Sequence, residues 1–596
     1  MIFLPNKHKR DNQYTNLYSI TIFSIVLFFI WMIINALIIF KQFTIVQVLS
    51  VGILFFLLLL VLIWLFMKSF FHDKLILNNY TIISAFFLSS FLLLLANNVN
   101  PMFSSYTPTY PLIETELKLG WNIDTVFHVS IIQSILNFGY PSIGQHGTLP
   151  MVYHVLSHYI DAGLIFLTGL EPYDSYGLFF HFKIFIILSI ILIFIFIITK
   201  ELIPFLYIMS IIIFMPIILG TWHLIGSHGL SYTSMLIILG SIWIFHILYI
   251  KDKNSTYDLF FLLLFVVFIS IGKISSGFMY AIFIGFYLVL KQPKDIKVYL
   301  LGSIWIMFFF IYKNTMIDTE VSNIYILPSL HNVLQFLTDG SFTYFKMPKP
   351  IYASLAFLAL IFFLFKTKNI RRLFLASLFS FLILMLITLI IPMNSNSDIF
   401  YFQYALSIIL DLFVLQALFS NISLKIKQHN ISLKETIIII IMFMIWIYFH
   451  YVTEVHFRKH TLPEKTLDQI TTLLHGERRP LYSFRENLFE YLEERNLTKN
   501  DVVLFIPKEI YEEEINVFKG RKYARGMLIY AITGVPLIHG IVALGNTYGY
   551  ADYNKSAEWV NKNNFNKEVI CTQNLSKYII LTKKFNPPNF KLYRCK

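Results

Sequence analysis

Apolar runs of about 15 to 25 residues, separated by short polar segments, fill the first 450 positions of the chain. Runs of this length can cross the hydrocarbon core of a bilayer as helices, which needs about 20 residues each. The pattern predicts about thirteen transmembrane helices, at roughly 17–40, 43–67, 75–96, 176–198, 203–219, 231–250, 258–272, 277–290, 298–312, 350–365, 373–391, 400–419 and 436–450. The main interruption is a polar stretch at 97–175, which we expect to form a large loop.

From about Tyr451 the pattern becomes mixed, charged and polar, and predicts no further span. We expect a helix at 486–496, a buried strand at 501–507 and a helix at 523–534 that Gly534 ends. Short strands are expected near 536–540, 568–572, 577–582 and 590–595. The sequence therefore predicts two domains, a transmembrane domain at 1–450 and a soluble α/β domain at 451–596.

Composition excludes an ordinary soluble protein, because 57% of the residues are hydrophobic, only 14% are charged and the mean hydropathy is +0.67. The fold class that this predicts is a polytopic α-helical membrane protein. The net charge of +13 does not indicate a nucleic-acid partner, because Lys and Arg lie in short segments between apolar runs rather than in one patch. The first apolar run is too long for the core of a signal peptide, so we interpret it as a span.

The basic segments also predict the topology. With the N-terminal segment 7–10 in the cytoplasm, the alternate connections carry Lys68, Lys74, Lys200, Lys251, Lys253, Lys291, Lys294, Lys297, the segment 366–372 and the segment 425–434. All of them then lie inside, as the positive-inside rule requires. The loop 97–175 and the C-terminal domain lie outside, on the extracytoplasmic face of a cell membrane. Cys571 and Cys595, the only two cysteines, can form a disulfide there, but the sequence does not decide whether they do.

Candidate chemistry is concentrated between Gly120 and Asp161, within this loop. Asp124 and His128 are one helical turn apart, and His154, His158 and Asp161 follow at similar spacing, so two faces with acid and imidazole groups can meet in one site. We expect Asp124 to open an amphipathic helix at the membrane surface that ends near Gly139. Asp124 then either caps this helix or serves as a general base or metal ligand. The His154 and His158 pair suits either a metal or the polar face of an interfacial helix.

Other outward segments carry further candidates. Lys273 and Ser275 lie in the short turn 272–277 between two apolar runs, where a lysine must reach water, pair with a carboxylate or bind an anionic ligand such as phosphate. His228 lies in the tight outward loop 220–229, and Asp398 lies with two asparagines at the outer end of a span. We predict that His154, His158, Lys273, Ser275, Asp398 and His228 contact substrate.

An outward loop opening with a helix-borne Asp, followed by many spans and an outer α/β domain, is similar to the GT-C superfamily of membrane glycosyltransferases. The segments DTVFH at 124–128, YH at 153–154 and YGY at 548–550 resemble bacterial surface-polysaccharide members most. The resemblance implies a polyprenyl-phosphate-linked sugar as donor, a glycan or lipid as acceptor and membrane lipids as surroundings. It also implies that Asp124 is the catalytic carboxylate, assisted by His128.

The chain differs from the family in two respects. The candidate loop follows the third predicted span rather than the first, and no outward DxD or ExD pair occurs, so a divalent cation (Mg²⁺ or Mn²⁺) stays open as a cofactor. Two alternatives also remain, a transporter or flippase for lipid-linked saccharides and a non-catalytic component of an assembly machine. A transporter predicts ionisable residues distributed through the spans, whereas the mid-span sequences read as almost wholly Ile, Leu and Phe.

Overall fold

The computed structural model describes residues 123–144, 156–173, 256–316, 349–390, 402–414, 480–507, 525–538, 565–573 and 577–595 almost without gaps, together with scattered residues near 176, 232–244, 441 and 510. Its described elements fall into two compact units. One contains α12, α13, α14, α16, α17 and the helical segment 405–414, and we call it the helical unit. The other contains α6, α7 and every element from α21 onward, and we call it the loop–tail unit.

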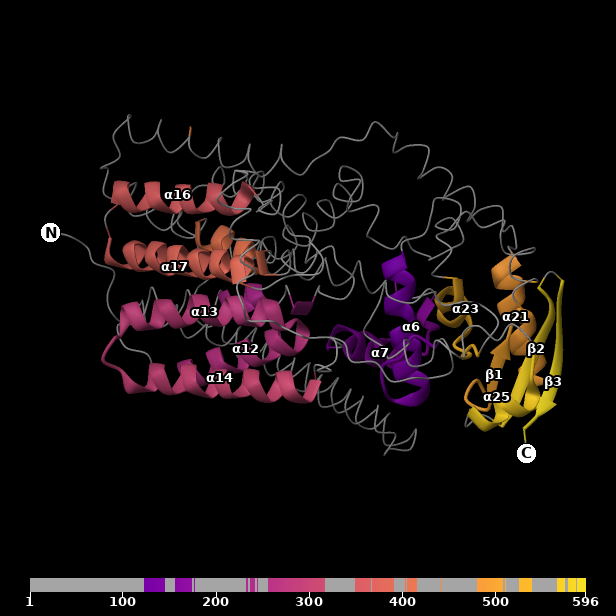
Figure 1. Ribbon diagram of the computed structural model, residues 1–596. Helices are drawn as coiled ribbons and strands as arrows, with labels where there is room; N and C mark the ends of the chain where they lie inside the picture. Colours follow the sequence, from indigo (N-terminus) through magenta and orange to yellow (C-terminus); the bar gives the residue numbers. More distant parts are fainter. Residues whose placement is uncertain are drawn as a thin grey trace, which may run out of the picture. The chain divides into compact units, whose positions relative to one another are not determined.

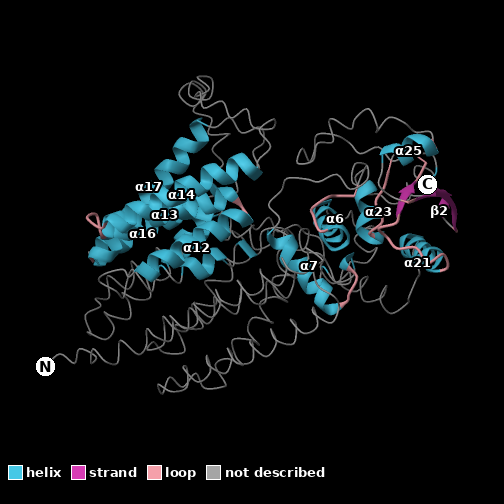
Figure 2. Ribbon diagram, turned by 90° about the horizontal axis from the view of Figure 1, so that it is seen from below, coloured by secondary structure: helices cyan, strands magenta, loops and turns pink. Residues whose placement is uncertain are grey.

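The helical unit is a bundle of long apolar helices: α12 (Thr256–Gly272), α13 (Ile274–Lys291), α14 (Ile296–Met316), α16 (Lys349–Phe365) and α17 (Lys368–Ile390). They lie side by side in both ribbon views (Figures 1 and 2). Each coincides with a span expected from the sequence. By length and composition α13 and the segment Lys368–Ile387 can cross a membrane, and the apolar stretches found in the other described helices, such as Ile296–Ile311 in α14, are shorter.

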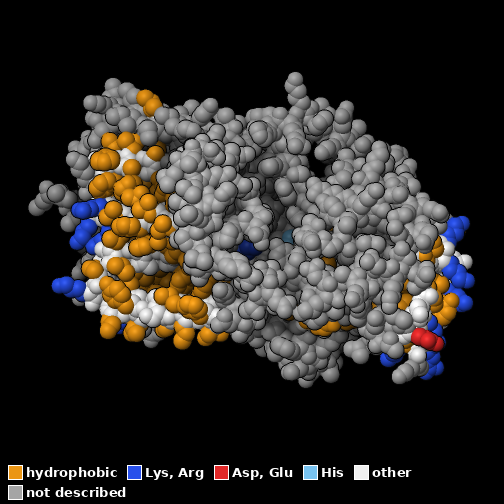
Figure 3. Space-filling model, in the orientation of Figure 1, with side chains coloured by type: hydrophobic (Ala, Val, Ile, Leu, Met, Phe, Trp, Pro, Cys, Tyr) orange, Lys and Arg blue, Asp and Glu red, His pale blue; other side chains and the backbone are white. Residues whose placement is uncertain are grey.

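The helical unit exposes apolar side chains, most clearly along α14, where Leu300, Met307 and Phe310 are each more than half exposed. Figure 3 shows apolar side chains over these helices, with Lys and Arg gathered at one end of them. Exposed apolar surface of this kind is what a lipid-facing helix presents. The count of thirteen spans stays a prediction, because the expected spans at 17–40, 43–67, 75–96, 176–198 and 203–219 lie outside the described residues.

The loop–tail unit contains α6 (Ile123–Phe138), α7 (Leu156–Thr168), α21 (Pro480–Glu493), α23 (Arg525–Thr533), α25 (Lys567–Gln573) and a three-stranded sheet. In the sheet, β1 (Val502–Phe505) pairs in parallel with β2 (Tyr578–Phe585), which pairs in antiparallel with β3 (Pro588–Arg594). One hydrophobic core joins α6 and α7 to α21, α23 and the sheet. The loop helices α6 and α7 and the C-terminal elements therefore fold together, although the composition places a domain boundary between them at residue 450.

The expected elements of the C-terminal region mostly form. The expected helices correspond to α21 and α23, and Gly534 ends α23 at a φ of 69°. Residues 501–507, 577–582 and 590–595 supply β1, β2 and β3, whereas the expected strand at 536–540 is only a bridge between Leu537 and Leu504.

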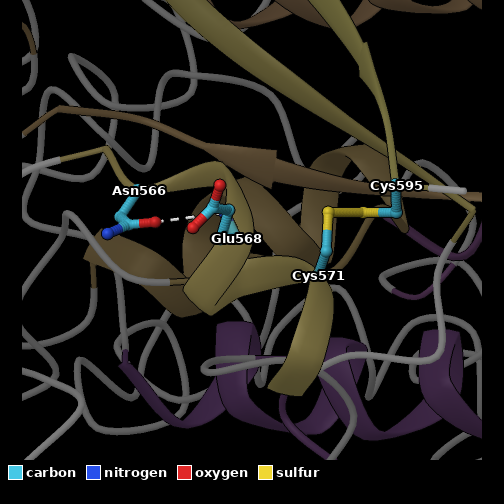
Figure 4. The surroundings of a disulfide bond; sticks show 4 residues. All are labelled: Asn566, Glu568, Cys571 and Cys595. Carbon is cyan, nitrogen blue, oxygen red and sulfur yellow. Dashed lines mark hydrogen bonds between the residues drawn. A yellow bond between two sulfur atoms is a disulfide. The ribbon is translucent and has the colours of Figure 1, made fainter.

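The strand expected at 568–572 is wrong, because this segment forms α25. Asn566 caps it, with its side-chain oxygen accepting a hydrogen bond from the Glu568 N–H at 3.1 Å. Figure 4 shows that α25 ends beside β3, where Cys571 and Cys595 form a disulfide with a Cα–Cα distance of 5.3 Å. The sequence did not decide whether the two cysteines pair, and the structure shows that they do.

Candidate functional site

Two buried histidines meet between the helices of the loop. His128 lies on α6 and His158 on α7, and the Nδ1 atom of His128 is 2.7 Å from the Nε2 atom of His158. Their ring planes are inclined at 35°, and both side chains are almost completely buried, at 5% and 1% exposure. The spacing along each helix allowed the two faces to meet in one site, and the structure brings His128 and His158 into contact. Their roles toward a substrate stay predictions.

The contact limits how many protons the pair can hold. A hydrogen bond between two ring nitrogens needs one donor and one acceptor, so one of these nitrogens carries a proton and the other does not. A second proton at the contact would place two donors face to face inside an apolar core, which is strongly unfavourable. In the neutral pair one ring therefore donates and the other accepts at this contact.

Carboxyl groups accompany both histidines along their helices. Asp161 is one turn after His158 on α7 and only 1% exposed. Asp124 is one turn before His128 and lies in the first turn of α6, because that helix begins at Ile123. The backbone of Asp124 is described, but its side chain is outside the described set. The predicted carboxylate therefore lies on the same helix as His128, and His158 reaches the pair from α7.

The environment of α6 differs from the expectation. We expected an amphipathic helix at a membrane surface, but every residue from Val126 to Ile135 is buried. The expectation of an exposed polar face is wrong, because tail residues pack against α6; its position at a membrane surface stays a prediction. The end of the helix is as expected, since Gly139 takes a φ of 83° and its N–H bonds to the Ile135 carbonyl at 2.9 Å.

Polar side chains on α6 join the loop to the tail. The Nε2 of Gln133 donates to the Ala531 carbonyl at 3.2 Å, and the Nδ2 of Asn137 donates to the Gly534 carbonyl at 2.9 Å. Both acceptors lie at the end of α23, where helix carbonyls have no partner within the helix. Figure 2 shows α6 and α23 side by side. These contacts fix the helix that carries Asp124 and His128 against the tail, and sequence reasoning missed them.

A second connection runs through the sheet edge. Leu537 donates its N–H to the Gly144 carbonyl at 2.8 Å, while the Ile538 N–H bonds to the Leu504 carbonyl of β1 at 2.9 Å. The segment that follows α6 is thus hydrogen-bonded to residues 537–538, which lie along β1. Gly144 has a φ of 65°, and a Cβ there would lie 2.2 Å from the ring of Tyr530. Only glycine fits this junction without a shift of the ring or the backbone.

The helical unit contains Lys273 and Ser275 at the tip of a helical hairpin. Lys273 is the single extended residue between α12 and α13, and it is half-buried. The helices pack closely because Gly277 lies against Ser270, where a Cβ would come within 2.6 Å of the Ser270 backbone. Within the described chain, the buried hydroxyls of Ser275 and Ser276 have no hydrogen-bond partner. A lysine and two hydroxyls at a helix N-terminus are suited to an anion.

Three predicted site residues, His154, His228 and Asp398, lie outside the described residues, so their placement is not described. Among the residues that are described, no three His, Cys, Asp or Glu side chains are close enough to hold a metal ion. A role for Mg²⁺ or Mn²⁺ therefore stays as open as it was from the sequence.

One buried carboxylate was overlooked in the sequence. Asp411, in the helical segment 405–414, is fully buried and accepts a hydrogen bond from the Ser354 hydroxyl of α16 at 2.5 Å. The Ser407 hydroxyl is 3.4 Å from its other oxygen. The interpretation that the mid-span sequences are almost wholly Ile, Leu and Phe is wrong here, because this expected span places Gln403, Ser407 and Asp411 on one face at four-residue spacing.

Comparison with known proteins adds no relative. No protein-family model, no curated protein sequence and no solved structure matches the chain.

Proposed function

We propose that the chain is a membrane glycosyltransferase of the GT-C type. It moves a sugar from a polyprenyl-phosphate donor to a glycan or lipid acceptor on the outer face of the cell membrane. The observation that carries the proposal is the helix α6, which holds Asp124 in its first turn and the buried His128–His158 contact one turn later.

The shared core supports placing the loop and the tail on one side of the membrane. Residues 123–144 and 480–594 contribute to one continuous hydrophobic core, which a lipid bilayer cannot divide. The disulfide between Cys571 and Cys595 supports the extracytoplasmic side, because disulfides persist in oxidising compartments. Both arguments agree with the side that the basic connections predict.

In the proposed reaction Asp124 accepts the proton of an acceptor hydroxyl while the acceptor oxygen bonds to the anomeric carbon of the sugar. The bond between that carbon and the donor phosphate breaks, and the polyprenyl phosphate leaves with both electrons of the bond. The predicted role of Lys273 and Ser275, in the helical unit, is to bind a phosphate group. The His128–His158 pair takes up or returns one proton on the acceptor side.

The test replaces the gene copy in its own host with Asp124→Asn. We expect loss or truncation of the surface glycan by mass spectrometry, as in a deletion strain, while membrane abundance on a blot is unchanged. Glu490→Gln, at an exposed position of α21, is the matched control and should leave the glycan intact. An intact glycan in the Asp124→Asn strain would remove Asp124 from the mechanism.

The buried Asp411 favours a second candidate, a transporter or flippase for a lipid-linked saccharide. Ionisable residues inside transmembrane bundles commonly mark the path of a substrate or ion. Purified protein in detergent separates the two functions, since an enzyme transfers sugar from a polyprenyl-phosphate donor to an acceptor without a membrane to cross. Product formation that Asp124→Asn abolishes and Asp411→Asn spares would favour the transferase. Complete lack of product, with Asp411→Asn abolishing glycan export in cells, would favour transport.

A further inference from the structure

Six cationic side chains gather at one end of the helical unit. Lys291 ends α13, Lys294 and Lys297 lie in and after the link to α14, and Lys368, Arg371 and Arg372 lie in the first turns of α17. Figure 1 shows both helix links at the same end of the bundle. The Nη2 of Arg372 lies 3.4 Å from the Lys291 carbonyl, which ties the two segments together. We call these six residues the basic cluster.

Three of the six cations in the basic cluster have no ion-pair partner among the described residues. Asp295 is the single carboxylate in the described segments 291–297 and 367–372, and one of its oxygens accepts the Lys297 backbone N–H at 3.1 Å. Lys294, Lys368 and Arg371 are exposed and form no ion pair with any described residue. The cluster therefore presents several uncompensated positive charges to its surroundings.

The position of the charges on α17 is also unfavourable for the helix alone. Lys368 and Arg371 lie in the first turns of α17, where no acidic residue is present. The helix dipole disfavours cations at this end. An external anion would turn this cost into an attraction, because it would be bound by the side chains and by the helix dipole together.

Exposed apolar side chains adjoin the basic cluster. Ile296, Tyr299 and Leu300, in the first turns of α14, are 70%, 49% and 55% exposed. They follow directly on Lys294 and share the end of the helix with Lys297. A ligand that touches both groups must join an anionic head to an apolar tail.

We propose that the basic cluster binds the headgroup of an anionic phospholipid, whose acyl chains lie along the first turns of α14. The inference rests on the membrane placement proposed above and adds the lipid class and its binding position. It places the anionic lipid at the cytoplasmic end of the bundle, where the positive-inside rule puts these segments.

The test uses the purified full chain in neutral detergent, titrated with dioleoyl-phosphatidylglycerol and with dioleoyl-phosphatidylcholine, with bound lipids counted by native mass spectrometry. The variant is Lys294→Gln, Lys368→Gln and Arg371→Gln together, which retains Lys291, Lys297 and Arg372. The matched control removes the same charge from exposed positions of β2 and β3, by Lys583→Gln, Lys584→Gln and Lys591→Gln. Gel filtration and thermal unfolding verify that each variant is folded.

We expect the wild type and the control to prefer phosphatidylglycerol, and the cluster variant to bind it at least about tenfold more weakly, since each basic residue near a lipid surface adds attraction. The preference should also shrink as salt is raised. Equal binding of the two lipids by the wild type, or an equal loss in the control, would overturn the proposal. Lipid binding is measured without any sugar transfer, so the lipid proposal can hold even if the proposed enzymatic function fails. Failure of the chain to enter phosphatidylcholine nanodiscs would instead reject the membrane placement.

Discussion

The histidine pair connects chemistry to stability at the scale of single residues. One ring nitrogen of His128 and one of His158 form a hydrogen bond at 2.7 Å, and both rings are buried in the loop–tail unit. Removing one ring leaves a buried nitrogen of the other without this partner, which costs about 1 to 3 kcal/mol. Removing both rings leaves no polar group to satisfy at this contact. The two changes should therefore be strongly non-additive.

We predict that His158→Phe lowers the apparent melting temperature of the full chain by a few degrees, and that His128→Phe does the same. The double variant should lose clearly less than the sum of the two single losses. Scanning fluorimetry of the wild type, the two single variants and the double variant at neutral pH measures this double-mutant cycle. Strictly additive losses would show that the two rings do not depend on each other in solution.

Gly144 offers a second test at this scale because its surroundings are specific. Gly144 and Gly169 both have positive φ values, 65° and 67°, but only a Cβ at Gly144 would meet another group, the buried ring of Tyr530. Burial raises the pKa of the Tyr530 hydroxyl well above its usual value, so this ring remains neutral.

We predict that Gly144→Ala lowers the stability of the full chain by about 2 to 4 kcal/mol, from backbone strain and the clash together. Gly169→Ala adds backbone strain alone and should cost about 1 kcal/mol. Urea unfolding followed by tryptophan fluorescence measures both. Equal losses would mean that the 142–144 segment does not pack against Tyr530.

At the scale of elements, the turn before β1 is held to the start of β2 by Asp501. Its carboxylate accepts hydrogen bonds from Lys577 at 2.8 Å and from the hydroxyl and N–H of Thr498 at 2.6 and 3.0 Å. The Lys577 bond, followed by the Thr498 bonds, lowers the pKa of Asp501 to about 2. The ordinary value in an unfolded chain is about 3.9.

The depressed pKa sets the sign of a pH effect. The Asp501 contacts stabilise the fold fully above about pH 4, and this contribution is lost as pH falls toward 2. We predict that Asp501→Asn lowers the melting temperature at pH 6 and that the difference from wild type shrinks toward pH 2. Glu490→Gln is the control, since Glu490 is exposed and has no ion pair among the described residues. A difference that stays constant with pH would show that the ionised carboxylate is not responsible.

The elements also show what sequence patterns can and cannot predict. The apolar runs that predicted α12, α13, α14, α16 and α17 succeed because a long run permits few alternatives to a helix. The prediction for the segment 568–572 fails because five residues fit a strand or a helix equally well. The Asn566 cap favours the helix. Helical spacing put His128 with Asp124 and His158 with Asp161 on shared faces, and allowed those faces to meet. The cover that α23 gives to α6 did not, because those segments are about 400 residues apart.

At the scale of the whole molecule, the topology is the prediction on which the proposed function depends. The chain has only two cysteines, and they form the Cys571–Cys595 disulfide. Cys571→Ser therefore leaves a single thiol in the tail, and a chain with both cysteines changed to serine can receive a new one elsewhere. Lys294→Cys in that second background places a thiol in the exposed link between α13 and α14, at the end of the bundle that carries the basic cluster.

We predict that a membrane-impermeant maleimide labels the thiol of Cys571→Ser in intact cells, whereas the Lys294→Cys thiol reacts only after the membrane is opened. The wild type should react in neither condition until the disulfide is reduced. Labelling is measured as a mass shift of the purified full chain. The reverse pattern would place the loop and the tail in the cytoplasm, because one core contains residues of both. It would then exclude a reaction of Asp124 with an acceptor on the outer face.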